Sequence, residues 1–352
     1  MNPRRRIVSA ALAGGAIAGG AFARTGVASA ALWQALVGGG SHGEASRLGD
    51  GQALVRGAAT AFGTTVSVAA VDADVAKARA AIDEALAATQ RIDALMSLHR
   101  DDSQLSCLNR DGGLDGADPH VLRNLQFAAQ LAALSDGAFD VTVQPLWDAF
   151  ARRAAEGALP SGAEIAAARR RVGAGAVALD GDRVRLRRGT AVTLNGIAQG
   201  YASDVATAIL AAAGIRDALV DTGEFGAAGS NPHHQPWTLG LQHPRDARRM
   251  IATIRMDGRF LATSGDYATR FSADFRHHHV LDPRTGRSPP SFSSVAVAAR
   301  SGMIADGLAT ALMVLDAEAG RRLLARYPGS DAVWIDKSMK LFATPGMPVV
   351  AT

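Results

Sequence analysis

Two polar residues one helical turn apart suggest metal chemistry near the C-terminal end of the chain. Asp306 and Thr310 lie in an apolar segment, residues 301–315, that reads as a helix, so their side chains share one face. A carboxylate and a hydroxyl can both bind a hard cation such as Mg²⁺, and a carbonyl from the turn at Asn195 and Gly196 could add a third oxygen. A solvated aspartate with a core-facing threonine would give the same pattern, because such pairs are common on helices.

The turn at Asn195 and Gly196 opens the stretch around which the chain is organised. An apolar run, residues 191–194, precedes it, and an Ala-rich helix is expected at 197–213, followed by a second apolar run at 218–220. A helix start of this kind presents unpaired N–H groups and attracts anions. An ordinary buried βαβ unit would look the same, so the pattern alone does not establish phosphate binding.

A run of three histidines, 277–279, is the other feature that could carry chemistry. In a strand, His277 and His279 would share one face, so all three could not bind one metal. His279 stands out because the segment 280–286 follows it with an acid, a base and a glycine. Ser264 lacks a G-x-S-x-G elbow, and no Walker loop, HExxH or CxxC motif occurs, which argues against a serine hydrolase, a P-loop enzyme or a zincin.

The elements that must position these residues alternate irregularly between helix and strand. Asp72 and Asp74 can cap a helix over 75–96, and Asp118 with Pro119 marks another helix start. The mixture predicts the α+β class. The sequence also indicates a β-rich run at 61–71, a capping box at Ser161 and Glu164, a hairpin at 177–188, strands at 237–241, 250–256, 259–262, 275–281 and 294–299, and a hairpin at 333–342.

The first thirty residues have the layout of an export signal. Three arginines, 4–6, precede a mildly apolar Ala/Gly-rich run at 7–23. Ala28-Ser29-Ala30 offers a cleavage site, and Ala21-Phe22-Ala23 is a second candidate. The paired arginines resemble the twin-arginine export pattern, which predicts a periplasmic protein. We therefore expect a signal peptide at 1–30, a linker or N-terminal arm at 31–56, and one folded domain at 57–352.

Charge and cysteine content narrow the function classes. The chain holds 37 Lys and Arg against 33 Asp and Glu, and four of the arginines lie in residues 1–30, which contain no acid. The remainder is neutral overall, so the sequence predicts no nucleic-acid partner. Cys107 is the single cysteine, which rules out an internal disulfide.

Six segments in order resemble the ApbE family of flavin transferases. Each is weak alone, but together they cover about residues 57–345 with compatible spacing, which implies an ApbE-like, T-fold-like domain of mixed helices and largely antiparallel sheets. The segments are Phe62-Gly63-Thr64, the stretch from Met96 to Asn109, Gly137 to Val143, Leu194 to Asp204, Thr263 to Tyr267, and His279 to Gly286 together with Ala305 to Thr310.

The resemblance implies a Mg²⁺-dependent transfer of FMN from FAD, its substrate, to a threonine hydroxyl of a target flavoprotein, with release of AMP. By position, Asp306 and Thr310 would bind Mg²⁺ through their side chains and Gly196 through its carbonyl. His279 would act on the incoming hydroxyl, with Asp282 as its support. The residues implied to line the FAD site are Phe62, His99, Ala138, Phe139, Asp140, Thr193, Gln199 and Leu281.

Four positions depart from the commoner pattern of the family. His99 stands where an aromatic ring often stacks, Thr193 and Gln199 stand where charged residues are frequent, and Glu224 replaces the second glycine of a usual Gly-Gly pair. These changes leave the implied metal ligands intact and mark a subgroup with its own target. Exported relatives serve ion-pumping redox complexes or the flavoprotein of nitrous-oxide respiration, and the twin-arginine pattern favours the latter. The sequence does not indicate an oligomeric state.

Two other functions remain open at this point. A Mg²⁺-dependent FAD pyrophosphatase would use the same site with water in place of the threonine. A non-catalytic FAD-binding assembly factor for a periplasmic or membrane electron-transfer complex would need no cation over the scissile bond, and Asp306 with Thr310 argues against it.

Overall fold

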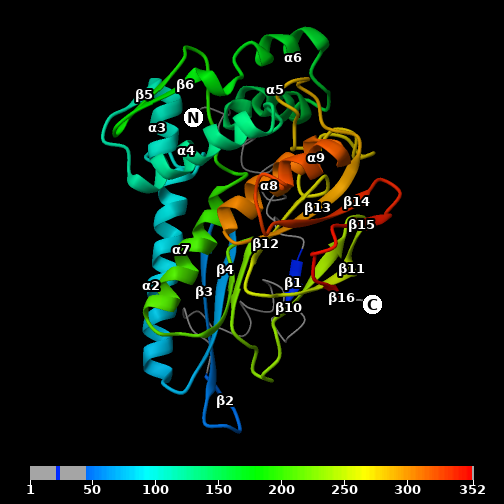
Figure 1. Cartoon of the computed structure of the whole chain (residues 1–352). Coiled ribbons are helices and arrows are strands. Elements are labelled where there is room, and N and C mark those ends of the chain that lie inside the picture. Colours follow the sequence, from blue (N-terminus) through cyan, green and yellow to red (C-terminus); the bar gives the residue numbers. More distant parts are fainter. Residues whose placement is uncertain (1–20, 24–44, 351–352) are drawn as a thin grey trace, which may run out of the picture.

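A nine-stranded antiparallel sheet forms the centre of the protein, whose computed structural model describes residues 21–23 and 45–350 (Figure 1). Its strand order is β15-β14-β13-β12-β9-β8-β4-β3-β2. The strands, in chain order, are β2 Ser46–Arg47, β3 Ala53–Ala61, β4 Thr64–Asp72, β8 Asp217–Asp221, β9 Phe225–Ala228, β12 Phe260–Gly265, β13 Phe292–Ala299, β14 Asp331–Asp336 and β15 Leu341–Ala343.

Two smaller antiparallel sheets complete the β structure. A four-stranded sheet, β1-β10-β11-β16, packs against one face of the large sheet, and a three-stranded sheet, β5-β7-β6, lies at the end of the molecule that carries α3 and α4 (Figure 1). Their strands are β1 Ala21–Ala23, β10 Thr238–His243, β11 Asp246–Arg255 and β16 Val349–Val350, then β5 Gly113–Leu114, β6 Val177–Asp180 and β7 Arg183–Leu186.

Helices cover the other face of the large sheet. α2 and α7 pack on β3, β4 and β8, and α8 packs on β12 and β13 beside α7 (Figure 1). The helices are α2 Val75–Met96, α3 Gln104–Asp111, α4 Pro119–Leu134, α5 Gln144–Ala155, α6 Gly162–Arg169, α7 Ala198–Ala212, α8 Gly302–Val314 and α9 Ala317–Leu324, with short 3₁₀ turns at Val141–Val143 and Ala174–Ala176.

Strand β13 shows how the sheet separates two hydrophobic cores. Val295 and Val297 point toward the helices, while Ala296 and Ala298 point toward the four-stranded sheet. Every residue of β13 is buried, because a central strand with both faces covered alternates between two cores rather than between core and solvent.

Local signals in the sequence are confirmed where a side chain caps a helix. The Asp74 carboxylate accepts from the N–H groups of Ala76 and Lys77 at the start of α2, and Asp118 caps α4 ahead of its N1 proline. The capping box of Ser161 and Glu164 forms at α6. The predicted α+β class with antiparallel pairing is therefore confirmed, since all paired strands run antiparallel.

Two expected strands are absent. Residues 191–194 form no strand, because Asn109 rather than a neighbouring strand pairs with the backbone of Val192. Residues 275–281 form a loop held by an isolated bridge between Arg270 and His278. In both places buried apolar side chains gave a strand-like pattern, although the backbone groups bond to side chains and to nearby loop residues instead.

The folded region begins earlier than residue 57. Ala53 and Val55 are fully buried in β3, and β2 pairs with this strand, so part of the segment expected as a linker, 31–56, belongs to the large sheet. Of the expected signal peptide at 1–30, Ala21–Ala23 form β1 beside β10, and the arginines 4–6 and the cleavage site lie outside the described residues. Among the described helices, none is long and apolar enough to span a bilayer.

Candidate functional site

The crossing of α7 and α8 creates the site. A Cβ at Gly200 would lie 2.1 Å from the Gly302 carbonyl oxygen, so the two backbones touch where only glycine fits. The Asp204 carboxylate of α7 accepts from the Gly302 and Met303 N–H groups and from the Ser301 hydroxyl, and so caps α8. These contacts fix the rotation of α8 and point its Asp306 at the first turn of α7.

Asp306 is bound to the start of α7. Its Oδ2 accepts from the Gly200 N–H at 3.0 Å, and the residue is 4% exposed. The start of α7, which attracts anions, therefore has the Asp306 carboxylate beside it, an arrangement that the helix dipole favours. Burial raises the pKa of Asp306 to about 7, against the opposing effect of the Gly200 hydrogen bond.

Thr310, on the same face of α8 as Asp306, has neighbours from two other parts of the chain. One turn further on, the Thr310 hydroxyl lies 3.2 Å from the hydroxyl of Ser264, at the end of β12. A Cβ at Gly196 would lie 3.1 Å from Thr310 Oγ1, so the backbone of the 195–196 turn runs directly against this threonine. The fold therefore brings together the three residues implied as metal ligands, Gly196, Asp306 and Thr310, although they are 114 positions apart at the extremes.

A second buried carboxyl, Glu224, faces the same region. Its Oε2 accepts from the Thr263 N–H at 2.9 Å, and the residue is 6% exposed. Burial, followed by the charge of Asp306, raises its pKa well above the usual range. In the described part of the chain, no lysine or arginine pairs with either carboxyl.

This donor set fits Mg²⁺. Carboxylate, hydroxyl and carbonyl oxygens are its preferred ligands, and two buried carboxyls without a cationic neighbour would be stabilised by a divalent ion. Within residues 21–23 and 45–350, no group of three or more His, Cys, Asp and Glu side chains forms a metal-binding cluster. The ligand set implied for Mg²⁺ would not form such a cluster, because Asp306 is the only His, Cys, Asp or Glu side chain in it.

Gln199 braces the turn between β8 and β9. Its Nε2 donates to the Thr222 carbonyl at 2.9 Å, and the Thr222 hydroxyl donates to the Gln199 carbonyl at 2.8 Å. Gly223, at φ 95°, allows this contact, because a Cβ there would lie 2.1 Å from Gln199 Nε2. Gln199, implied as an FAD contact, therefore positions the turn that carries Glu224.

The loop 138–141 reaches the site through backbone contacts. The Thr193 N–H donates to the Val141 carbonyl at 2.8 Å, and the Phe139 ring lies against Gly196. Asp140 accepts from both the N–H and the hydroxyl of Thr142, at 2.8 and 2.6 Å, while burial raises its pKa. Ala138 is buried in the main core beside Phe139.

Asn109 holds the segment that leads to Gly196. Its amide oxygen accepts from the Val192 N–H at 2.7 Å and its Nδ2 donates to the Val192 carbonyl at 2.8 Å, as a neighbouring strand would. The sequence analysis did not predict this role of Asn109, and it did not predict the contact between the hydroxyls of Ser264 and Thr310. Neither spacing nor residue type in the sequence indicates these partners, because both contacts join segments far apart in the chain.

The remaining residues implied as FAD contacts lie in different surroundings. Phe62 sits in the β3–β4 turn at φ 54° and packs against two core clusters. His99 is exposed, and its N–H donates to the Ser97 hydroxyl. Leu281 is buried in a separate cluster with Leu146 and Phe150.

His279 and Asp282 do not pair. The Nδ1 and backbone N–H of His279 lie 3.1 and 3.0 Å from the Thr269 carbonyl, so Nδ1 carries the proton and Nε2 keeps its lone pair. Asp282 instead accepts from the Arg284 guanidinium at 2.9 and 3.0 Å. The expected support of His279 by Asp282 is thus wrong, and the Thr269 carbonyl orients the ring. Burial lowers the pKa of His279, which keeps it neutral.

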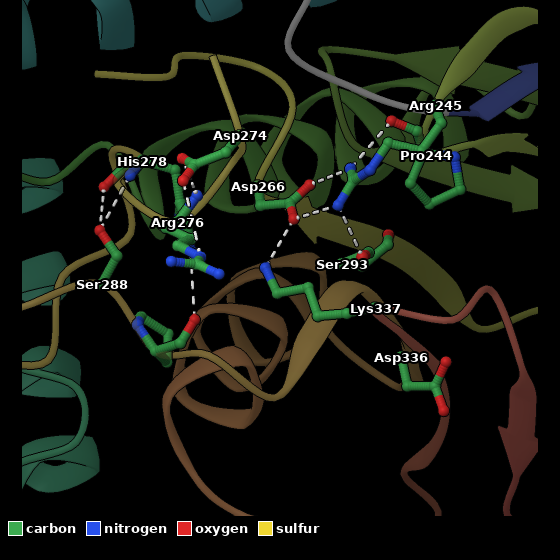
Figure 2. A network of polar contacts seen from close by, with 12 residues as sticks. Pro244, Arg245, Asp266, Asp274, Arg276, His278, Ser288, Ser293, Asp336 and Lys337 are labelled. Atoms are coloured by element: carbon green, nitrogen blue, oxygen red, sulfur yellow. Dashed lines mark hydrogen bonds and ion pairs between the residues drawn. The ribbon is translucent and has the colours of Figure 1, made fainter. Parts of the chain in front are cut away.

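An ion-pair network around a buried carboxylate lies near His278, in the loop 275–281 that carries the three histidines (Figure 2). Figure 2 shows Asp266 between Arg245 and Lys337, which come from the β10–β11 and β14–β15 connections. The Arg245 guanidinium donates to both Asp266 oxygens at 2.6 and 2.7 Å, and Lys337 Nζ donates to Oδ2 at 2.6 Å. Asp266 is fully buried, so the network joins three distant segments around one carboxylate.

His278 makes stability depend on pH. It is fully buried, and burial, with the charges of Lys337 and His279, lowers its pKa to about 4. Between pH 6.5 and 4 the unfolded chain binds a proton that the folded protein does not, so stability falls as the pH falls. We expect a loss of about 2 kcal/mol between pH 8 and pH 5 from this residue alone.

Urea unfolding at both pH values would measure this effect. The variant His278→Gln, whose amide can still donate toward the Pro289 carbonyl that His278 Nε2 approaches, serves as the reference. Its unfolding free energy should decline less between pH 8 and pH 5 than that of the wild type. Parallel declines would show that His278 does not titrate in this range.

Similarity to known proteins identifies the family of this chain. The model of the ApbE family matches residues 62–334. The FAD:protein FMN transferase of Vibrio cholerae is 34% identical over 241 residues, covering 66% of this chain and 72% of that protein, and the one of Salmonella typhimurium is 31% identical over 252 residues, covering 66% and 71%.

Comparison with solved structures also identifies the ApbE fold. The crystal structure of the ApbE protein from Thermotoga maritima has a TM-score of 0.73 at 28% identity, covering 83% of this chain and 97% of that one. The apo flavinyl transferase ApbE of Pseudomonas stutzeri has a TM-score of 0.70 at 31% identity, covering 83% and 94%. The fold and site thus define an enzyme of the transferase class that handles flavin. The chain belongs to the ApbE family.

Proposed function

We propose that this enzyme transfers FMN from FAD to a threonine hydroxyl of a target flavoprotein, in a Mg²⁺-dependent step that releases AMP. The observation that carries the proposal is the convergence of Asp306, Thr310 and Gly196 at the start of α7. Bound there, Mg²⁺ would neutralise the pyrophosphate oxygens and stabilise the charge that develops on the leaving AMP.

The residues of this chain would divide the remaining tasks. Asp306 and Thr310 would hold the cation, with the Gly196 carbonyl as a third ligand. His279, neutral and with Nε2 unprotonated, would accept the proton of the threonine hydroxyl as its oxygen bonds to the FMN phosphorus and the bond to AMP breaks. The enzyme needs no nucleophile of its own, because the acceptor protein supplies it.

The location and the target are also proposals. The arginines 4–6 and the following apolar run support export to the periplasm by the twin-arginine route. A protein there would flavinylate a membrane-linked electron-transfer partner, either an ion-pumping redox complex or the flavoprotein of nitrous-oxide respiration.

A reconstitution with FAD and Mg²⁺, with and without a flavoprotein domain that carries an acceptor threonine, tests the activity. We expect AMP release together with an acceptor that gains the mass of FMN, and little of either product when EDTA removes the metal. AMP and free FMN without a labelled acceptor would indicate the pyrophosphatase. Bound FAD without AMP would overturn the proposal in favour of a binding factor.

A further inference from the structure

A positively charged surface lies beside His279. It consists of Arg245, Arg270, Lys337 and the ring of Phe275, which three separate segments of the chain bring into contact. We call these four residues the basic surface. The mechanism above gives none of them a task.

Among the residues that the structure describes, Asp266 is the only carboxylate that pairs with the basic surface. Asp266 is fully buried, while the Arg245 and Lys337 side chains that bind it remain 26% and 31% exposed. The negative charge of Asp266 is therefore buried, while parts of the two cationic side chains that pair with it reach the surface. Together with the exposed Arg270, three cations oppose one buried anion, which leaves a net positive potential outside.

Phe275 holds Arg270 in place without neutralising it. The ring lies 3.9 Å from the Arg245 guanidinium carbon and 5.0 Å from that of Arg270, so it is in contact with both cations. Phe275 adopts φ 60°, a strained backbone conformation for an aromatic residue. Among the described residues, no carboxylate pairs with Arg270.

Nearby acids are already engaged elsewhere. Asp274 binds Arg276 and accepts from the Ser272 hydroxyl. Asp336 accepts from the N–H groups of Ser338 and Lys340 in its own turn. These acids therefore have partners of their own and do not pair with the exposed cations of the basic surface.

The loop geometry connects the basic surface to His279. Arg270 pairs with His278 in an isolated antiparallel bridge, and the next residue, His279, takes its orientation from the Thr269 carbonyl, adjacent to Arg270. The basic surface and His279 therefore share one loop, in which Arg270 directly follows the residue whose carbonyl orients the His279 ring.

We propose that the basic surface docks an acidic segment of the acceptor protein and so presents its threonine to His279. The inference rests on the proposed function, because it assigns a task within that reaction. Its physical basis is charge complementarity, which favours an acidic chain over a neutral one and speeds encounter at low salt.

Arg270→Glu is the test variant, because Arg270 is exposed and reversing its charge leaves the buried Asp266 pairs intact. The probe is a fluorescein-labelled peptide with a threonine between two Asp-Asp pairs, and its twin carries Asn in place of each Asp. Arg183→Glu, an exposed arginine on β7 of the three-stranded sheet, is the matched control. Fluorescence anisotropy at low and high salt reports binding.

We expect the wild type to bind the Asp peptide more tightly than the Asn peptide at low salt, with the difference reduced at high salt. Arg270→Glu should weaken binding of the Asp peptide about tenfold, and Arg270→Lys and Arg183→Glu should not. Equal binding of both peptides, or no effect of Arg270→Glu, would overturn the docking surface.

FAD binding separates this proposal from the alternatives. If Arg270→Glu weakens FAD binding as much as peptide binding, the basic surface serves the phosphates of FAD and the inference is wrong. If the Asp peptide binds as expected but the reconstitution yields no flavinylated acceptor, the proposed function fails while the docking surface stands.

Discussion

Asp306→Asn is expected to reduce FMN transfer by at least about a thousandfold, because loss of a metal-holding charge forfeits several kcal/mol of transition-state stabilisation and each 1.4 kcal/mol is about tenfold in rate. The asparagine oxygen can still accept from the Gly200 N–H, so the helix crossing should remain intact. FAD binding should weaken much less than turnover. AMP release and FAD affinity, measured on the same preparation, would show this separation.

The stability of Asp306→Asn distinguishes a functional carboxylate from a structural one. Asp306 lies buried near Glu224 without a cationic side chain, so removing its charge should raise the melting temperature in the absence of metal. Added Mg²⁺ should raise the melting temperature of the wild type more than that of the variant, because a ligand that binds only the folded state stabilises that state. Full activity in Asp306→Asn would rule out the metal assignment.

Gly200→Ala is expected to destabilise the protein by about 3 kcal/mol, near the upper end of the usual cost of overpacking, because the backbone must move. The added Cβ would lie 2.1 Å from the Gly302 carbonyl oxygen and 2.6 Å from the Cβ of Asp306. The helices must separate, which would also move Asp306 away from the α7 start. The melting temperature and the rate of AMP release should both fall.

Gly162→Ala is the matched control for this substitution. Gly162 begins α6, has no atom within 4 Å of an added Cβ, and does not need a positive φ. Alanine there should be neutral or mildly stabilising, since glycine is the weaker helix former. If Gly200→Ala were equally harmless, the close contact of α7 with α8 would not be what positions Asp306.

Local signals in this sequence predicted the capped helices α2, α4 and α6, but they missed α3, α5 and α9 and gave a strand where the structure has a loop. The caps at Asp74, Asp118 and Ser161 act within a few residues, so their types and spacing suffice to place helix starts. The loop at 275–281 looked like a strand because apolar and aromatic residues occur there, but its backbone bonds to residues of the same loop, such as Phe271 and Ser272 to His277.

Motif order in the sequence was enough to indicate the family and to single out the residues that we propose hold Mg²⁺. Asp306 and Thr310 share a helix face whatever the rest of the fold does, since that follows from helical periodicity. The pairing of His279 with Asp282 could not be predicted in the same way, because Arg284 competes for the carboxylate and only geometry decides between them.

The sequence by itself determined the family of this protein, the starts of the capped helices α2, α4 and α6, and the shared helix face of Asp306 and Thr310, but it did not indicate α3, α5 or α9. Only the tertiary structure decided how they meet: the Gly200–Gly302 contact that aims Asp306 at α7, the Ser264 hydroxyl beside Thr310, and the Arg245–Asp266–Lys337 network under the basic surface. The physical reason is that capping and periodicity act over a few residues. These contacts join segments that lie between 21 and 102 positions apart in the sequence, and their partners are set by how the helices and sheets pack.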